Sequence, residues 1–458
     1  MQKNREEARQ AEYRKILRKS STVYREIVRE EPDLFHRDLE MVLAPALDSF
    51  VLWVLKKAQQ DGIKRLYFLA RDGYFMYRCA RIYCAAMQLP VECRYLSCSR
   101  YSVRIPVFHL NMEDALDYIC RGGIDVTIEK ILSRSGIGEE EKAKVIREIF
   151  QAEEDQGVLP YARLGEIREK LRNCGRFMES TYENSRKAYP CLQGYLRQEG
   201  LMDPVKAALV DSGWVGSMQK TLNLVLEHMG RQEKLTGYYW GLYELPQGAA
   251  RKDYFCYAFS PEKGLREKVY FSNCLFETIF SAPHGMTMGY RQEEEKWVPV
   301  YAQIDPQRAA FMKKLEQGFV SFTKRAAKQG RKLSEIRTVE YKKTAKQVLA
   351  LFMGKPTKME AETFGILEFS DDVLDFERQQ IAEPLSGKEI RANHVWNKAL
   401  TMLGIRHGHI KESAWYEGSV ARYGRREAYH LFQYRLYKYL LYMRKKYYYL
   451  KMKEREDD

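Results

Sequence analysis

Arg71, Asp72 and Gly73 form a charged turn directly after a short apolar run, Leu66–Leu69, and before a helical pattern that begins at Phe75. This order predicts a buried strand, a tight turn and a helix, the unit at which open α/β sheets bind ligands. A cation, a carboxylate and a glycine that lets backbone N–H groups approach an anion suit a phosphorylated substrate. The alternative interpretation is a turn closed by a local ion pair.

A second segment of the same kind lies much later in the chain. The apolar run Ala207–Val210 is followed by the sequence DSGWVGS at residues 211–217, and then by a helical pattern over residues 218–229. We therefore predict a second strand, loop and helix, in which Gly213 and Gly216 free the backbone to curl.

Two residues of this second loop carry groups that contact ligands. Ser217 stands at the predicted helix start, where it can cap the helix and donate a hydrogen bond to a phosphate. Asp211 follows the strand directly, where it can bind ribose hydroxyls or a metal-bound ligand, although a helix N-cap would explain it too. We expect Gly216→Val to exclude a bound phosphate and to leave the fold intact.

The remaining pattern predicts an α/β fold with a parallel sheet. Five strands are expected, at residues 66–69, 93–97, 207–210, 238–243 and 254–258. We expect three regions: N-terminal helices over residues 1–60, an α/β core over 61–300 with a helical insertion at about 105–204, and a helical region over 301–458.

Three further sites have residue types that suit an anionic substrate or proton transfer. Arg100 and Arg104 lie four residues apart and can clamp an anion, or can form an exposed basic helix face. Glu277 stands in an otherwise apolar stretch, where a buried carboxylate needs a partner or a chemical task. His284 is a weaker candidate for the same site. The pair His407 and His409 lacks neighbouring carboxylates and does not predict a metal centre.

The composition indicates which kind of partner the protein binds and which classes of protein are excluded. The 458 residues carry a formal net charge of +14, which favours anionic partners. The charged segment Met1–Lys19 is not a secretory signal, and no run of eighteen apolar residues predicts a membrane span. The nine cysteines show no metal-binding spacing and are typical of reduced, cytoplasmic thiols.

The C-terminal helix interleaves aromatic and basic residues from Tyr429 to Lys453. One interpretation is peripheral contact with the acidic inner face of a membrane, with the aromatic rings at the headgroup level. The other is a helix whose aromatic face packs on the body while its basic face is solvated.

The two loops in this order resemble those of the type I phosphoribosyltransferases. In that family a first loop holds pyrophosphate, and a second loop, acidic and rich in Gly and Ser or Thr, binds the 5-phosphate of phosphoribosyl pyrophosphate. Residues 71–73 match the first loop and residues 211–217 match the second. The chain departs from the family pattern because Ser212, not a second acid, follows Asp211, and because the segment from about Arg100 to Pro204 is far longer than the family's mobile loop.

A closer resemblance is to a bacterial group of polysaccharide biosynthesis, some members of which are fused to a haloacid-dehalogenase phosphatase domain. It is carried by the two loops and by shorter matches that cover most of the chain: residues 43–47, 68–73, 99–100, 210–217, 276–277, 282–285 and 415–419. The resemblance implies a glycan phosphoribosyltransferase that moves 5-phosphoribose onto a sugar hydroxyl of a glycan, lipid-linked or free. A separate phosphatase then removes the phosphate, and no nucleic acid takes part.

The resemblance also implies roles for particular residues. Arg71, with Arg100 and Arg104, would hold the pyrophosphate, and Asp72 would bind Mg²⁺ directly or through water. The donor's ribose and 5-phosphate would be bound by the second loop, which comprises Asp211, Ser212, Gly213, Trp214, Gly216 and Ser217, with His284 nearby. Glu277, or failing that Asp211, would deprotonate the acceptor hydroxyl, and single displacement would invert the anomeric configuration.

Two other classes of function compete with this one. Residues 69–74 loosely resemble the DxDGT motif of haloacid-dehalogenase hydrolases, but Ala70 stands where that chemistry needs a nucleophilic aspartate. The third class is a non-catalytic scaffold of a polysaccharide assembly complex, which the basic C-terminal helix would suit.

Overall fold

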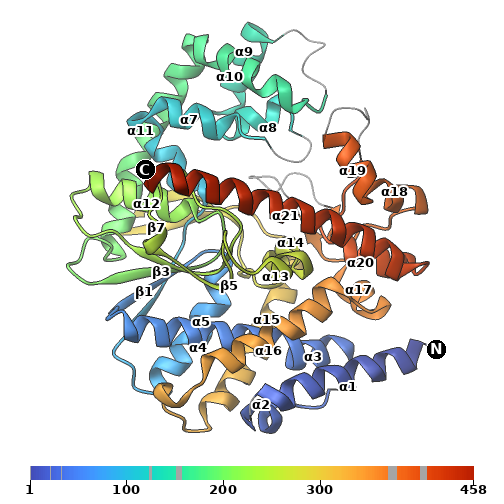
Figure 1. Cartoon of the computed structure of the whole chain (residues 1–458). Helices are drawn as coiled ribbons and strands as arrows, with labels where there is room; N and C mark the ends of the chain where they lie inside the picture. Colours follow the sequence, from blue (N-terminus) through green and yellow to red (C-terminus); the bar gives the residue numbers. More distant parts are fainter. Residues whose placement is uncertain are drawn as a thin grey trace.

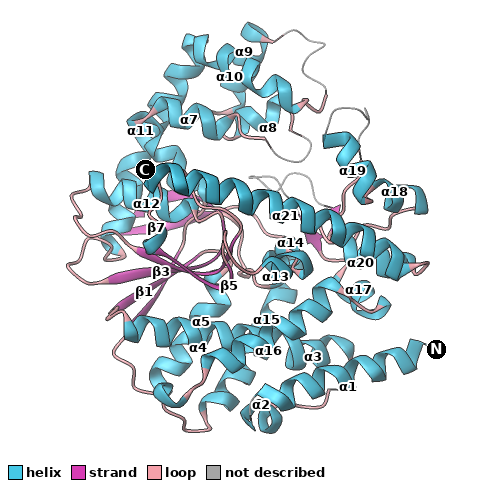
Figure 2. Cartoon of the chain, in the orientation of Figure 1, coloured by secondary structure: helices cyan, strands magenta, loops and turns pink. Residues whose placement is uncertain are grey.

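A sheet of five parallel strands forms the centre of the computed structural model, which describes residues 2–20, 22–31, 33–122, 126–150, 157–369, 379–402 and 410–457. His407 and His409 lie outside the described residues. The strand order is β2-β1-β3-β4-β5, and the strands are β1 (Arg65–Leu69), β2 (Glu92–Leu96), β3 (Ala207–Trp214), β4 (Thr236–Leu242) and β5 (Tyr254–Phe259). The predicted α/β fold with a parallel sheet is confirmed, and Figure 2 shows the sheet among its helices.

Alternate side chains of the strands enter two separate cores. Leu66, Phe68 and Val210 belong to one core, and Tyr67 and Leu69 belong to the other. Successive side chains of a strand point to opposite faces of the sheet, and here both faces are covered by helices. Residues 66–69 and 207–210 are therefore continuous apolar runs.

One face of the sheet is covered by helices from both ends of the chain (Figure 1). The N-terminal elements are α1 (Gln2–Ser20), α2 (Thr22–Ile27), α3 (Leu34–Asp38), the π-helical turn η1 (Leu39–Leu43) and α4 (Ala44–Gln60), and α5 (Gly73–Ala86) follows β1. They share one hydrophobic core with α15 (Pro306–Ala327), α16 (Thr338–Gly354) and α17 (Lys358–Phe364). Helix α4 is therefore buried on nearly all sides.

The predicted insertion between β2 and β3 is helical and has a hydrophobic core of its own. It comprises α6 (Arg100–Arg104), the 3₁₀ helix η2 (Ile105–Leu110), α7 (Met112–Ile119), α8 (Ile128–Ser133), α9 (Glu139–Ile149), η3 (Tyr161–Arg163), α10 (Leu164–Asn173) and α11 (Gly175–Gln198). The insertion stands at the top of Figure 1, and the end of α11 returns to pack with α12 (Ser217–His228) on the second face of the sheet.

Short sheet elements that the sequence pattern does not predict follow the central sheet, and one of them interrupts the predicted helical region over 301–458. The antiparallel hairpin β6 (Thr287–Glu293) and β7 (Lys296–Tyr301) contacts α11, and β8 (Glu368–Phe369) pairs with β9 (Gln379–Gln380). The remaining helices are α13 (Leu265–Tyr270), α14 (Asn273–Ile279), α18 (Gly387–Ala392), α19 (Val395–Met402), α20 (Tyr416–Tyr423) and α21 (Glu427–Asp457), and short 3₁₀ turns cover Arg251–Asp253 and Leu333–Glu335. Within the described residues, no helix is both long and apolar enough to span a bilayer.

Candidate functional site

A cavity of about 270 Å³ lies at the carboxyl ends of β1 and β3. In the strand order β2-β1-β3-β4-β5, the next two strands along the chain lie on opposite sides of β1, with β2 on one side and β3 on the other. Such a switch point is where open α/β sheets bind ligands. The cavity is lined by the turn after β1, the end of β3, the start of α12, and side chains from the insertion, α14 and α15. The two loops that the sequence predicts therefore meet in one site.

The turn after β1 is short and fixed by its neighbours. The N–H of Ala70 donates to the carbonyl oxygen of Leu96 at 3.0 Å, and the Ala70-Arg71 peptide bond is cis. Gly73 begins α5 so close to β1 that a Cβ atom there would stand 2.9 Å from the carbonyl carbon of Phe68. Arg71 and Asp72 line the cavity, as predicted.

The second loop is shorter than the sequence predicts because β3 continues to Trp214. Gly213 pairs with Gly241 and Trp214 with Leu242 of β4, so four predicted loop residues are strand. Gly213 has φ +109°, and a Cβ atom there would stand 2.7 Å from the carbonyl oxygen of Gly241. The strand thus extends past the end of β1, and its free edge faces the cavity.

The turn between β3 and α12 depends on Gly216. This residue is the N-cap of α12 with φ +72°, and a Cβ atom there would stand 2.8 Å from the Tyr254 ring. Gly216→Val would consequently strain the backbone and displace Tyr254, so our expectation that it leaves the fold intact is wrong. Ser217 is the first helical residue and not the cap, which leaves its hydroxyl at the cavity wall.

Two carboxylates, Asp72 and Asp211, share the cavity and disfavour each other's ionisation. The Ser212 hydroxyl donates a hydrogen bond to Oδ2 of Asp72 and so joins β3 to the turn after β1. Burial raises the pKa of Asp72, and burial together with the charge of Asp72 raises the pKa of Asp211 to about 7. Ionisation of Asp211 is therefore incomplete near neutral pH, and a bound cation would favour it.

These carboxylates fit a magnesium ion that arrives with a phosphorylated ligand. In the described part of the chain, no cluster of three or more His, Cys, Asp or Glu side chains is arranged to hold a metal. Mg²⁺ commonly takes one or two protein carboxylates and completes its shell with substrate phosphate oxygens and water. Asp72 alone would meet this requirement, and Asp211 lines the same cavity.

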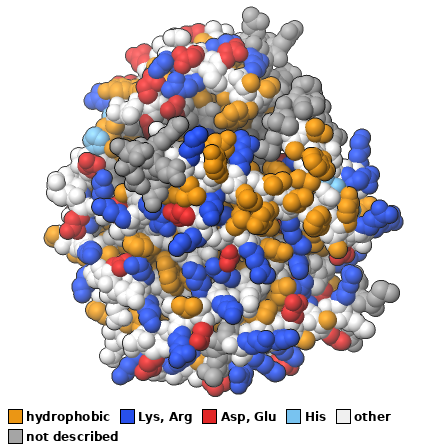
Figure 3. All heavy atoms as spheres, in the orientation of Figure 1, with side chains coloured by type: hydrophobic (Ala, Val, Ile, Leu, Met, Phe, Trp, Pro, Cys, Tyr) orange, Lys and Arg blue, Asp and Glu red, His pale blue; other side chains and the backbone are white. Residues whose placement is uncertain are grey.

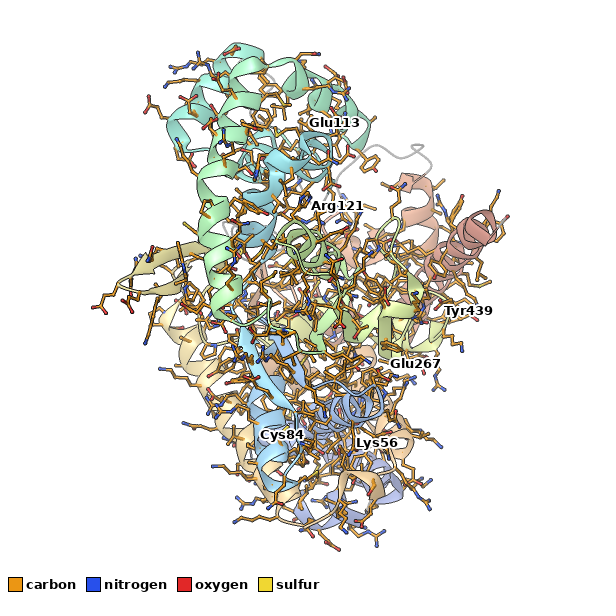
Figure 4. The ribbon with its side chains drawn as sticks, turned by 90° about the vertical axis from the view of Figure 1, so that its left-hand side faces the viewer. Lys56, Cys84, Glu113, Arg121, Glu267 and Tyr439 are labelled. Atoms are coloured by element: carbon orange, nitrogen blue, oxygen red, sulfur yellow. The ribbon has the colours of Figure 1, made fainter. Side chains whose placement is uncertain are left out.

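Four arginines surround the acid pair. Arg71, Arg100 and Arg308 all lower the pKa of Asp72 by their charge, which partly offsets its burial. Arg308 comes from the first turn of α15, and Arg121 comes from the end of α7 in the insertion. Figure 4 shows Arg121 where the insertion meets the rest of the chain. Sequence reasoning missed Arg121 and Arg308 because neither follows a strand nor belongs to a recognisable motif.

Glu277 lies in α14 and lines the same cavity. The indole N–H of Trp214 donates a hydrogen bond to its Oε1 atom, so the carboxylate that the sequence singles out is held at the end of β3. A predicted base and the predicted ribose-binding loop are therefore adjacent.

Besides Gly73, two predicted site residues, Arg104 and His284, lie away from the cavity lining. The Arg104 guanidinium lies 4.5 Å from the ring centroid of Tyr118, where burial lowers its pKa. His284 accepts from the Tyr95 hydroxyl at Nε2 and donates to the Gly285 carbonyl oxygen at Nδ1, both at 2.8 Å. Both ring nitrogens of His284 are thus engaged in structural bonds, and burial lowers its pKa.

The fold and site define an α/β protein with a polar cavity at the switch point of a doubly wound sheet. A comparison with models of known protein families finds no match, and a comparison with curated protein sequences finds no significant match. The geometry of the cavity and the resemblance of its two loops are therefore the features that indicate a function.

Proposed function

We propose that the protein transfers 5-phosphoribose from phosphoribosyl pyrophosphate to a hydroxyl of a glycan and releases pyrophosphate. The observation that carries the proposal is the meeting of the two loops: Asp72, after β1, and Asp211, in β3, line one cavity, and Ser212 bonds to Asp72. A phosphorylated sugar donor needs cationic groups for its phosphates and oxygen acceptors for its ribose hydroxyls. The cavity holds both kinds of group.

The 5-phosphate and the pyrophosphate of the donor bind to different parts of the cavity. The 5-phosphate binds at the start of α12, where backbone N–H groups and the Ser217 hydroxyl point toward the ligand. Asp211 accepts from the ribose hydroxyls. Arg71, Arg100 and Arg308 hold the pyrophosphate, with Asp72 as the protein ligand of Mg²⁺, which when bound neutralises charge on the leaving group.

The chemical step needs a base because a sugar hydroxyl is a poor nucleophile. Glu277 takes the proton from the acceptor hydroxyl, and Trp214 orients its carboxylate through the indole N–H. The acceptor oxygen forms a bond to the anomeric carbon as the bond to pyrophosphate breaks. Attack opposite the α-linked pyrophosphate gives a β-linked 5-phosphoribofuranosyl product.

The biological setting is polysaccharide biosynthesis in the bacterial cytoplasm. The acceptor is a glycan, lipid-linked or free, and a separate phosphatase removes the 5-phosphate from the product. The proposal is supported by the loop resemblance and by the site geometry.

Transfer is tested by incubating the protein with phosphoribosyl pyrophosphate, Mg²⁺ and lipid-linked or synthetic glycans. Mass spectrometry should find one added phosphoribosyl group per acceptor, and NMR should find the β configuration. Asp211→Asn serves as the inactive control. An α-linked product would exclude single displacement, and phosphate release from simple phosphomonoesters without transfer would favour the hydrolase class.

A further inference from the structure

Helix α21 presents a long stripe of large apolar side chains to solvent. The helix has 31 residues, and the side chains of Phe432, Leu440 and Tyr447 are 60%, 52% and 62% exposed. Further exposed members recur every three or four residues and complete the stripe, which we define as Tyr429, Phe432, Leu436, Tyr439, Leu440, Met443, Tyr447 and Leu450. In Figure 4 Tyr439 lies at the outer edge of the molecule.

The opposite side of α21 fastens the helix to the body, so the stripe is not needed for folding. Lys438 donates to the carbonyl oxygen of Phe271 at 3.0 Å and pairs with Glu417 at 3.1 Å. The Tyr442 ring stacks on Tyr243 with centroids 5.2 Å apart. The helix therefore packs some of its aromatic residues on the body and leaves a second apolar face uncovered.

Basic side chains flank the stripe, and no acidic residue interrupts it. No Asp or Glu occurs in residues 428–453. Arg444 and Lys451 lie on one side of the stripe at the 3.6-residue helical period, and Lys446 lies on the other. Trp396 on the neighbouring α19 is 77% exposed and widens the apolar area. Figure 3 shows hydrophobic side chains gathered where α21 crosses this face, with Lys and Arg beside them.

We propose that the α21 stripe docks the protein on an anionic lipid surface. A helix lying in the interface buries its apolar face among the acyl chains, while flanking Lys and Arg residues meet the lipid phosphates. Tyr and Trp are the aromatic residues that favour the headgroup level. The exposed face of α21 and its surroundings has all three features: apolar side chains for the acyl chains, Lys and Arg for the lipid phosphates, and Tyr and Trp for the headgroup level.

A second copy of the chain fits the stripe less well than a membrane does. A two-fold interface brings the same patch of both subunits together, so the basic flanks would face basic flanks. With no acidic residue on this part of α21, that repulsion would not be compensated. An anionic membrane supplies the opposite charge along the whole stripe.

The docking face is physically linked to the cavity. Tyr243, which stacks on Tyr442 of α21, also contacts the ring of Trp214, a cavity-lining residue. Lys445 of α21 and the cavity-lining Arg121 both pair with Glu244, at 3.8 and 4.0 Å. Docking would thus leave the cavity on the body side of α21, one helix thickness from the lipid surface, where a lipid-carried acceptor can approach it. Only this last step depends on the proposed function.

The test is sedimentation of the full-length protein with vesicles of phosphatidylcholine, alone or mixed with phosphatidylglycerol, at low and high salt. The basic variant is Arg444→Gln with Lys446→Gln and Lys451→Gln, and the stripe variant is Leu436→Ser with Leu440→Ser and Met443→Ser. The matched control changes exposed residues far from α21, Val339→Ser with Lys328→Gln. Circular dichroism checks that each variant melts as the wild type does.

We expect the wild type to bind vesicles that contain phosphatidylglycerol, and salt to weaken the binding. The basic variant should lose roughly 100-fold in partition coefficient, at about fivefold for each charge removed. The stripe variant should lose about tenfold or more, and the control should match the wild type.

Two results would overturn the proposal. The first is failure of the wild type to bind anionic vesicles, or equal binding by all variants. The second is a dimer in light scattering that the stripe variant abolishes while vesicle binding is absent, which would assign the stripe to a second copy. The assay contains neither donor nor acceptor, so its failure leaves the proposed transfer untouched.

Discussion

The hydroxyl of Ser212 donates a hydrogen bond to Oδ2 of Asp72, across a separation of 140 residues in the sequence. This bond connects β3 to the turn after β1 at the switch point of the sheet. It also stabilises the ionised form of Asp72, whose pKa burial raises. Ser212 thus occupies the position where the type I phosphoribosyltransferases, which the loop resembles, usually carry a second acid, and contributes a donor in its place.

Ser212→Ala should weaken donor binding and leave the fold intact. Loss of a hydrogen bond to a charged group costs about 1.5–3 kcal/mol, so the Kd for phosphoribosyl pyrophosphate with Mg²⁺ should rise roughly 10- to 150-fold. Isothermal titration calorimetry measures the change. An unchanged Kd in a variant with wild-type melting would show that the bond does not support the site.

Asp211→Asn should stabilise the unliganded protein at high pH. The fold raises the pKa of Asp211 from 3.8 to about 7, so its favourable contribution is complete below about 3.8 and is lost as pH rises toward 7. Asparagine does not ionise, and the variant should gain on the order of 1 kcal/mol at pH 8, because partial exposure screens the repulsion.

The gain should shrink as the pH is lowered toward 4, where wild-type Asp211 is protonated. Thermal melting at pH 8, 6.5 and 5 measures the trend. A gain of the same size at all three values would mean that ionisation of Asp211 is not its source. The same variant should lose donor binding.

Glu277→Gln tests the proposed base. Glutamine keeps an oxygen acceptor for the indole N–H of Trp214 but does not take a proton. Turnover should fall by roughly 10²–10⁴-fold while donor affinity stays nearly constant. Glu267→Gln is the matched control, since Glu267 lies on α13 and pairs with Lys346 away from the cavity. Near-normal turnover in Glu277→Gln would assign the proton to another group.

The same substitution should affect donor affinity at Arg308 and stability at Arg104. Arg308 lines the cavity, so Arg308→Gln should raise the donor Kd about tenfold or more by removing a charge-assisted contact to phosphate. Arg104→Gln should lower the melting temperature, because the guanidinium packs on Tyr118, and should leave donor affinity nearly unchanged. Equal effects of the two variants on donor affinity would contradict this assignment of the pyrophosphate site.

Four strands of the central sheet could be predicted from the sequence because burial produces short apolar runs between turns, and the edge strand β2 because its residues alternate between polar and apolar. The end of β3 could not, since Asp211, Ser212 and Gly213 are typical of loops and become strand only through pairing with β4. The β6–β7 hairpin was missed because its turn is a run of glutamates and most of its side chains are solvated. Its Tyr290 nevertheless stacks on Tyr195 of α11.

The acid pair of the site could be predicted for a topological reason. Parallel strands end at the same edge of a sheet, so carboxylates that directly follow neighbouring strands meet. Arg121 and Arg308 reach the cavity from the insertion and from α15, and such packing leaves no local pattern in the sequence. The position of Arg104 could not be predicted for the same reason: its spacing from Arg100 is that of an anion clamp, but its side chain packs against Tyr118.

Calorimetric titration of the protein with phosphoribosyl pyrophosphate tests the central claim most directly. The account predicts saturable binding at one site per chain, strong dependence on Mg²⁺, and loss of binding in Asp211→Asn and Asp72→Asn. Ribose 5-phosphate should bind more weakly, because it lacks the pyrophosphate that Arg71, Arg100 and Arg308 hold. Absence of binding at millimolar donor with Mg²⁺, in protein that melts cooperatively, would contradict the account.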